Sequence, residues 1–390
     1  MNNEGLNQFV NNISQEDKKI ANIKNMFSYV IKKLEEKNAS DIYFQQELPP
    51  VIRAKQGNVE YLDYKKLTQE DIQMILELIL EPSIYGKKFS EIKAGREIDL
   101  IVTIESKRFR ANITSFYSNE RLGIYLRYIK DEIPALEKLG IPNTELFIEK
   151  IKNISGGLIL ICGPTGSGKS TTLASIIEYI NINYNRHIIT LEDPIEYLFR
   201  SKRSVITQKQ VLTDTDSFTH GLREALREDP DIIMVGEMRD TETILIALQA
   251  SETGHTVFAT LHTSSVAQTV ERIVNAFPDA KQQEIRVSLA LALKAIVVQR
   301  LVPTINGSRC LACEIAFNDK TIENNILRNQ INQIENTLFL GRKQGMLLLN
   351  HHLIELIKDG MISPEVALAY TYKPEDLLNE LKNTYGTFEL

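Results

Sequence analysis

Nine consecutive residues near the middle of the chain combine glycines, hydroxyl groups and one lysine at the spacing of a phosphate-binding loop. They are Gly163, Pro164, Thr165, Gly166, Ser167, Gly168, Lys169, Ser170 and Thr171. Glycines allow successive backbone N–H groups to curl inward, and a following helix adds the positive end of its dipole. Lys169 would then reach the outer phosphates, and Ser170 would hold a magnesium ion. The loop therefore predicts a binding site for a nucleoside triphosphate with Mg²⁺.

An apolar run that ends in a carboxylate could supply water-activating chemistry. The segment Asp231-Ile232-Ile233-Met234-Val235-Gly236-Glu237 is typical of a strand whose last residue is acidic. Ligands gather at the carboxyl ends of parallel strands, so Glu237 can face the γ-phosphate and orient and polarise an attacking water. The alternative is an exposed acid at a strand end that pairs with Arg239.

A second acidic strand end lies at residues 190–196. It contains Glu192, Asp193 and Glu196. These carboxylates could hold the magnesium shell or polarise water, and Glu192 is the first choice. For Asp193, which precedes a proline, turn formation is the alternative explanation.

Two histidines bracket an apolar stretch at residues 256–261. His255 and His262 are too far apart along one strand, and on opposite faces of it, to bind one metal ion together. We expect His262, at the carboxyl end, to sense the γ-phosphate, and His255 to contact a neighbouring element. A hydrogen-bonded structural role is the alternative for each.

An α/β domain is needed to position these residues. Four strand-like segments alternate with helical ones, at residues 157–162, 187–191, 231–236 and 256–261. This alternation predicts a mainly parallel sheet with helices on both faces. We assign the core of this domain to residues 141–317 and a helical region to residues 318–390.

The first 130 residues predict a smaller α+β domain, because their strands and helices do not alternate regularly. Residues 1 to about 20 are polar and predict a loosely held extension. Apolar residues from Ile20 onward predict an amphipathic helix, and Thr68-Gln69-Glu70-Asp71 predicts the start of another. Residues 131–140 begin with charges and a proline, which favours a linker.

The composition is that of an ordinary globular protein and limits its partners. Of the 390 residues, 43% are hydrophobic and 25% are charged, and the net charge is −6 at pH 7. An acidic balance argues against broad contact with a nucleic-acid backbone, so no direct nucleic-acid partner is expected. The sequence has no apolar run of about 18 residues and no signal-peptide pattern, which predicts a cytoplasmic location.

Three cysteines, Cys162, Cys310 and Cys313, are too few for a disulfide framework or a four-ligand zinc site within one chain. The pair Cys310-x-x-Cys313 could form half of a metal site shared between chains. Its apolar neighbours favour a strand instead.

Four segments in this order resemble those of secretion-superfamily ATPases and, within that group, the type IV pilus retraction ATPases. They are the phosphate loop and residues 189–196, 226–240 and 253–263. The resemblance covers about residues 25–375. It implies a RecA-like motor domain with a PAS-like N-terminal domain, ATP hydrolysis with Mg²⁺, and a homo-hexameric ring.

The resemblance also implies partners and further site residues. Members of the family act on a platform protein in the inner membrane and move pilin subunits out of the fibre, which powers twitching motility. We therefore expect a protein at the inner face of the cytoplasmic membrane, and a paralogous ATPase could be an accessory partner. Arginines of the N-terminal domain complete the site in this family, and Arg110 and Arg127 are the best positional matches. Ordinary surface ion pairs are the alternative for both.

Some residues depart from the retraction pattern. Tyr43 stands where the N-terminal motif usually has histidine, no glycine precedes Pro49-Pro50, and residues 321–328 only partly match the C-terminal retraction motif. The alternatives are a pilus assembly, type II secretion or DNA-transfer ATPase, or a non-hydrolysing accessory subunit that binds nucleotide. The four-cysteine zinc insertion of assembly and secretion ATPases is missing, which favours retraction.

Overall fold

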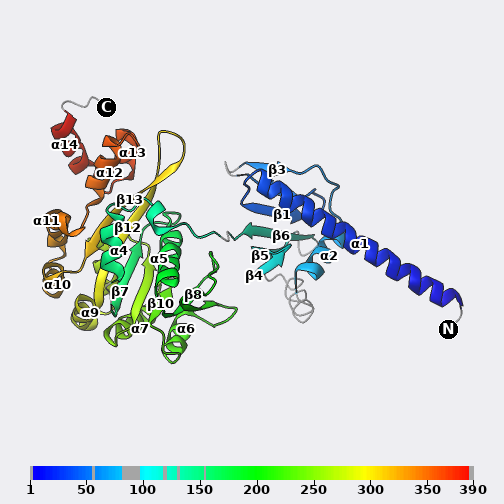
Figure 1. Ribbon diagram of the computed structural model, residues 1–390, viewed down its shortest axis with the longest axis horizontal. Coiled ribbons are helices and arrows are strands. Elements are labelled where there is room, and N and C mark those ends of the chain that lie inside the picture. The colour runs from blue at the N-terminus through cyan, green and yellow to red at the C-terminus, as the bar shows by residue number, and fades with distance from the viewer. Residues whose placement is uncertain are drawn as a thin grey trace. The chain divides into compact units, whose positions relative to one another are not determined.

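The computed structural model describes residues 3–54, 58–80, 97–116, 121–129, 132–152 and 155–385, with side chains described within residues 17–383. The chain divides into two compact units, Met1–Asp131 and Glu132–Leu390, which we call the N-terminal and C-terminal units (Figure 1). Each has its own sheet and hydrophobic core, and each is described separately.

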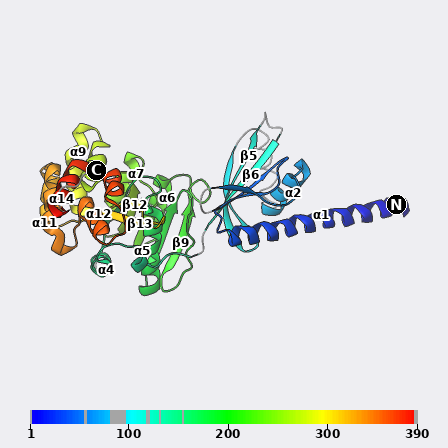
Figure 2. The same cartoon turned by 90° about the horizontal axis from the view of Figure 1, so that it is seen from above.

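The N-terminal unit is built on a six-stranded antiparallel sheet in the order β3-β2-β1-β6-β5-β4. Its elements are β1 (Asp41–Gln45), β2 (Val51–Arg53), β3 (Val59–Tyr61), β4 (Ile98–Ile104), β5 (Lys107–Phe116), β6 (Arg121–Tyr128), α1 (Asn3–Glu36) and α2 (Gln69–Ile79). Side chains alternate across the strands, so Phe109, Ala111 and Ile113 of β5 are buried while Arg108 is exposed. Residues of α1 and α2 complete the core on the buried face (Figure 2).

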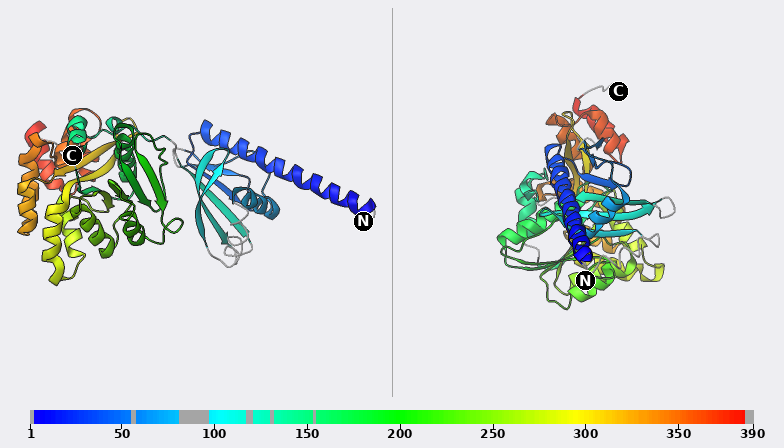
Figure 3. Two further views of the ribbon diagram at one scale, coloured as in Figure 1. Left: turned by 60° about the horizontal axis from the view of Figure 1, so that its bottom comes forward. Right: turned by 90° about the vertical axis from the view of Figure 1, so that its right-hand side faces the viewer.

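Helix α1 is longer than the sequence pattern predicted. Its apolar residues Ile23, Met26, Phe27, Val30, Ile31 and Leu34 are buried, which confirms the amphipathic helix. The helix begins at Asn3, so the polar segment predicted as a loosely held extension is part of this helix. Once a helix is nucleated, each added residue gains a backbone hydrogen bond, and polar residues do not prevent this. Figure 3 shows this end of α1 extending past the strands of its unit.

Helix α2 begins where the sequence predicted. The Thr68 hydroxyl accepts a hydrogen bond from the Asp71 backbone N–H at 3.1 Å, and Asp71 Oδ2 accepts one from the Thr68 backbone N–H at 2.8 Å. This reciprocal pair is a capping box, which satisfies two backbone donors that the helix itself cannot use.

The C-terminal unit is built on a seven-stranded sheet in the order β13-β12-β7-β11-β10-β8-β9. The strands are β7 (Gly157–Cys162), β8 (His187–Glu192), β9 (Val205–Gln210), β10 (Ile232–Val235), β11 (Thr256–Leu261), β12 (Leu293–Pro303) and β13 (Arg309–Phe317). All pairs are parallel except β12 with β13. Every residue of β7, β10 and β11 is buried, as expected for parallel strands with both faces covered.

Helices cover the sheet and extend the chain beyond it. They are α4 (Thr144–Lys152), α5 (Lys169–Asn183), α6 (Phe218–Ala225), α7 (Thr241–Glu252), α8 (Val266–Asn275), α9 (Asp279–Ala292), α10 (Lys320–Leu327), α11 (Ile334–Leu340), α12 (Leu349–Lys358), α13 (Pro364–Tyr370) and α14 (Pro374–Tyr385), with short 3₁₀ turns at Leu136–Lys138, Ile331–Gln333 and Gly341–Gln344. The predicted fold class is confirmed: an α/β RecA-like P-loop domain, a smaller α+β PAS-like domain and C-terminal helices.

The last helices form a cluster of their own. Apolar residues of α12, α13 and α14 pack together and against Val302 and Ala312, whereas α10 and α11 contribute to the main core. Cys310 and Cys313 lie in β13, which confirms the strand interpretation. Over the described residues, no group of three or more His, Cys, Asp and Glu side chains could hold a metal ion by itself. No helix in this part of the chain has the length and apolar character needed to cross a membrane.

Candidate functional site

The phosphate loop connects β7 to α5, as predicted, and packs against β12. Gly163 has φ 142° and Gly168 has φ 89°, backbone conformations that favour glycine. A Cβ atom on Gly163 would lie 2.3 Å from the Gln299 carbonyl oxygen. The amide of Gln299, which is 1% exposed, also donates to the Ser167 carbonyl at 2.9 Å. The loop therefore rests on a buried glutamine of β12.

The lysine of the loop is held inside the curve of the loop. Lys169 Nζ donates to the carbonyl oxygens of Gly163 at 2.8 Å and Pro164 at 3.0 Å. Burial lowers the pKa of Lys169, while the nearby carboxylates of Glu237 and Glu196 act in the opposite direction. Its ammonium is thus fixed at the N-terminus of helix α5, where phosphate oxygens bind in such loops.

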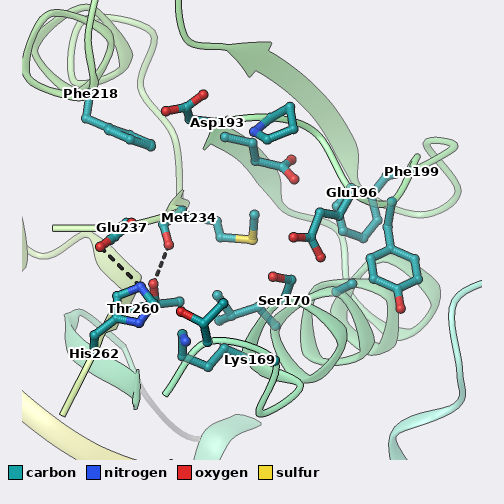
Figure 4. Close-up of a pocket in the computed structure, with 18 residues that line it drawn as sticks. Lys169, Ser170, Asp193, Glu196, Phe199, Phe218, Met234, Glu237, Thr260 and His262 are labelled. Atoms are coloured by element: carbon teal, nitrogen blue, oxygen red, sulfur yellow. Dashed lines mark hydrogen bonds and ion pairs between the residues drawn. The ribbon is translucent and has the colours of Figure 1, made fainter. Parts of the chain in front are cut away.

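One pocket gathers most of the predicted site residues. Its lining includes Thr165, Gly166, Lys169, Ser170, Glu192, Asp193, Glu196, Glu237 and His262 (Figure 4). These side chains come from the loop and from the carboxyl ends of β8, β10 and β11. The carboxyl ends of these parallel strands thus bring the acidic segments and His262 to one pocket beside the loop.

Glu237 is paired on both carboxylate oxygens. His262 Nε2 lies 3.2 Å from Glu237 Oε1, and Arg239 Nε donates to Glu237 Oε2 at 2.7 Å. The pairing with Arg239 is the one considered as an alternative to catalysis, but the Glu237 side chain is only 20% exposed and faces the pocket. Arg239 is also 3.9 Å from Asp193 Oδ2. A carboxylate held this way has a fixed orientation, which positioning a water requires.

Glu192 is buried beside the pocket. Its Oε1 accepts hydrogen bonds from Thr190 Oγ1 at 2.7 Å and Gln208 Nε2 at 2.9 Å. Burial raises the pKa of Glu192 to about 7 in spite of these bonds. With the exposed Asp193 and the Ser170 hydroxyl, it offers oxygen ligands of the kind that Mg²⁺ prefers. Mg²⁺ is usually held by few protein oxygens together with substrate phosphates, so this donor set fits such an ion.

The structure adds residues that the sequence interpretation missed. Tyr197 lies 2.9 Å from Thr171 Oγ1, hydroxyl to hydroxyl, and Thr260 donates to the Gly236 carbonyl just before Glu237. Phe199 and Phe218 also line the pocket. Gln299 had a visible signal, because a polar amide here directly follows the apolar run Ala295–Val298 of β12.

Three predicted residues are not among those that line this pocket. His255 precedes β11, at the opposite strand end from His262, and its Nδ1 lies 3.1 Å from the Ala250 carbonyl of α7. Arg110 and Arg127 belong to the N-terminal unit, where they stand opposite each other on the neighbouring strands β5 and β6. Arg127 Nε donates to Asp41 at 2.8 Å, and Arg110 lies 3.6 Å from Asp99. These are the ion pairs considered as the alternative, and 68% of the Arg127 side chain is still exposed.

Comparison with known proteins gives consistent matches over most of the chain. The type IV pilus retractation ATPase PilT of Pseudomonas aeruginosa is 38% identical over 339 residues, which cover 87% of this chain and 96% of that protein. The type IV pilus ATPase PilU of the same organism is 34% identical over 354 residues, or 90% of each chain. A crystal structure of the pilus retraction motor PilT with bound ADP has a TM-score of 0.82 and 40% identity, and covers 90% of this chain and 98% of that one.

The family assignment follows from the same region as the site. A family model described as Type II/IV secretion system protein matches residues 15–370, which include the phosphate loop, both acidic strand ends and the histidine segment. This chain therefore belongs to the type II/IV secretion system protein family.

Proposed function

We propose that this protein is an ATP-hydrolysing motor that powers type IV pilus retraction, and hence twitching motility. The observation that carries the proposal is the Glu237 carboxylate, oriented by His262 and Arg239 in the pocket of the phosphate loop. A protein that only bound nucleotide would not need a fixed carboxylate there. The likeness to PilT, whose solved structure holds ADP, supports both the nucleotide and the direction of work.

In the proposed reaction the loop binds the phosphates and Glu237 acts on water. Backbone N–H groups and Lys169 hold the β- and γ-phosphates in line. Glu237 orients a water so that its oxygen attacks the γ-phosphorus, and the bond from that phosphorus to the β–γ bridging oxygen breaks. ADP and inorganic phosphate leave, and the proton from water passes to phosphate or solvent. His262, in contact with Glu237, would register whether the γ-phosphate is present.

Mg²⁺ fits the oxygen donors beside the loop. Ser170, Glu192 and Asp193 are the residues that would hold it, directly or through water. When bound, the ion neutralises charge on the β- and γ-phosphate oxygens.

The wider assembly in the proposal is a homo-hexamer at the inner face of the cytoplasmic membrane. Its partner would be the platform protein of the pilus, with a paralogous ATPase as an accessory partner. Arg110 or Arg127 would complete the phosphate site, because a planar guanidinium suits the charge that develops on a transferred phosphate. Both are partly exposed on the sheet of the N-terminal unit, which leaves them available for this role.

ATP turnover of Glu237→Gln tests the catalytic part. The amide keeps the size of the side chain but cannot polarise water, so turnover should fall by roughly a hundredfold or more while ADP binding persists. Glu252→Gln, an exposed acid at the end of α7, is the matched control and should behave as wild type. Equal turnover in wild type and Glu237→Gln would remove Glu237 from its catalytic role. Tight ATP binding without any turnover would instead favour an accessory subunit.

Deletion of the gene tests the direction of work. Retraction predicts pili that are retained or in excess and do not shorten, as seen by electron microscopy and by loss of twitching. Cells without pili would point to an assembly motor instead.

A further inference from the structure

A buried carboxylate outside the pocket joins three separate elements. Glu314 lies in β13 and is 2% exposed. Its Oε1 accepts a hydrogen bond from the backbone N–H of Val266 at 2.7 Å, and its Oε2 accepts one from the Tyr372 hydroxyl at 2.5 Å. Burial raises the pKa of Glu314, while the Tyr372 hydroxyl and the backbones of Val266 and Leu349 act in the opposite direction. Val266 is the first residue of α8, so this side chain satisfies a backbone donor at the start of that helix, and Leu349 is the first residue of α12.

On one side of Glu314, helix α8 is firmly attached to the loop that carries His262. The loop covers residues 262–265, directly before Val266. Ser265 caps the helix by accepting from the Gln268 N–H at 3.1 Å, and the Gln268 side chain accepts from the Ser264 N–H at 2.6 Å. The buried hydroxyls of Thr263 and Thr269 lie 2.7 Å apart. A shift of this loop therefore moves the first turn of α8 with it.

On the other side, Glu314 holds the C-terminal helices through Tyr372. This residue lies in the connection between α13 and α14. The same connection is tied to α12, because Thr371 Oγ1 donates to Asn350 Oδ1 at 2.5 Å and Asn350 Nδ2 donates to the Lys373 carbonyl at 3.2 Å. Helices α12, α13 and α14 also share one apolar cluster. They can therefore respond as a group to a displacement of Tyr372.

A buried carboxylate that had only a structural role would lower the stability of the fold at this position. Burying an ionisable group is expensive, and apolar residues of similar volume often pack as well or better. Here two donors, from α8 and the α13–α14 connection, converge on the two oxygens, and the half-buried Arg300 of β12 lies close enough to interact with both Glu314 and Tyr372. The arrangement fixes the relative positions of elements that otherwise belong to different parts of the unit.

We infer that Glu314 is a positioning residue that links the His262 loop to helices α12–α14, so that occupancy of the nucleotide pocket is passed to the C-terminal helices. The inference rests on the proposed ATPase function, because it assigns a route by which the γ-phosphate site reaches a distant part of the chain. The route runs from Glu237 and His262 through α8 to Glu314, and from there to Tyr372.

Tyr372→Phe tests the link with the loss of a single hydroxyl, and Tyr370→Phe, two residues away in the same cluster, is its matched control. Hydrogen–deuterium exchange is followed in residues 262–275 and 349–385 of the full-length protein, with and without ADP and a non-hydrolysable ATP analogue. In wild type and Tyr370→Phe, nucleotide should change exchange in both segments. In Tyr372→Phe the response of 262–275 should persist while that of 349–385 falls to less than half. Turnover should fall severalfold with the KM for ATP unchanged.

Glu314→Gln provides a second variant, since its amide keeps the volume but offers only one acceptor oxygen to two donors. It should weaken the nucleotide response of both segments, and thermal unfolding checks that it is folded. Two results would overturn this inference without touching the proposed function. One is a nucleotide-induced change in exchange of residues 349–385 that is undiminished in Tyr372→Phe. The other is no such change in these residues in wild-type protein that hydrolyses ATP. Failure of wild type to bind nucleotide would remove the proposed function together with this inference.

Discussion

His352 of α12 shows how one backbone hydrogen bond can set the charge of a side chain. The Cys313 N–H donates to His352 Nδ1 at 3.0 Å, so this nitrogen must be free of a proton. The ring is 4% exposed. Burial lowers the pKa of His352 from 6.5 to about 4, although the acidic Glu355 and Asp359 nearby favour the charged form. The folded protein therefore resists protonation at a site that the unfolded chain protonates readily.

This histidine should make the protein sensitive to acid. Because the folded pKa lies below the unfolded one, its contribution to stability is present above about pH 6.5 and is lost as the pH falls towards 4. His352→Gln offers an acceptor oxygen without titrating. Relative to this variant, wild type should lose about 2 kcal/mol of unfolding free energy between pH 7.5 and pH 5, measured by urea unfolding. Curves that stay parallel over this range would contradict the assignment.

Gln299 gives a second prediction at the scale of one residue. Gln299→Leu removes the amide that holds the Ser167 carbonyl and leaves the underside of the phosphate loop unsupported. ADP affinity should fall about tenfold, or about 1.4 kcal/mol, in isothermal titration calorimetry. The exposed Gln249 of α7 supplies the control, Gln249→Leu, which should bind as wild type. Wild-type affinity in Gln299→Leu would show that the loop holds its shape without this contact.

At the scale of elements, the capping box of α2 should be measurable as stability of the N-terminal unit. Thr68→Ala removes the acceptor for the Asp71 N–H, and the helix then begins with one more unsatisfied donor. We expect a loss of about 1 kcal/mol in urea unfolding, most of which Thr68→Ser should restore. No difference between the alanine and serine variants would mean that water satisfies this donor equally well.

Elements whose signals lie in neighbouring residues were predictable from the sequence. The run 158–162 is continuously apolar and precedes the glycines of the loop, so β7 and α5 follow from neighbouring residues alone. The capping box of α2 is likewise local. In contrast, β9 is a polar edge strand, and its burial pattern is set by pairing with β8. Its sequence shows no regular alternation of apolar and polar residues, so the strand was not predicted.

Buried polar partners were the part of the site that the sequence could not supply. Gln299 meets Ser167, and Glu314 meets Val266 and Tyr372, only because the sheet brings distant segments together. A glutamine or glutamate within an apolar strand signals an unusual environment but does not identify its partner. Glu237 and His262 were predictable because a general rule places ligands at the carboxyl ends of parallel strands.

At the scale of the whole molecule, the residues of the nucleotide pocket and the arginines proposed to complete the phosphate site belong to different units. Every residue that lines the nucleotide pocket lies in the C-terminal unit, whereas Arg110 and Arg127 lie in the N-terminal unit. The two hydrophobic cores share no residue. Nucleotide binding and turnover should therefore be separable by changes confined to one unit.

Arginine-to-lysine variants of the full chain test this separation. Arg110→Lys and Arg127→Lys keep the charge but lose the planar fork, so ADP affinity should stay within about twofold of wild type. Turnover should fall roughly a thousandfold in the variant whose arginine reaches a phosphate. Arg108→Lys, at an exposed position of the same strand β5, is the control. Wild-type turnover in both variants would leave these arginines with their ion pairs to Asp99 and Asp41 as their only role.

The central position of β7 has a consequence for how the protein is made. This strand pairs with β11 on one side and β12 on the other, and both follow it by a long stretch of chain. At roughly 5–20 residues per second, the ribosome needs on the order of ten seconds after β7 before β12 is complete. During that time an apolar strand has an unpaired edge, and the phosphate loop lacks Gln299 beneath it. The nascent chain should thus depend on chaperones at this stage and acquire nucleotide binding only after residue 303 has left the ribosome.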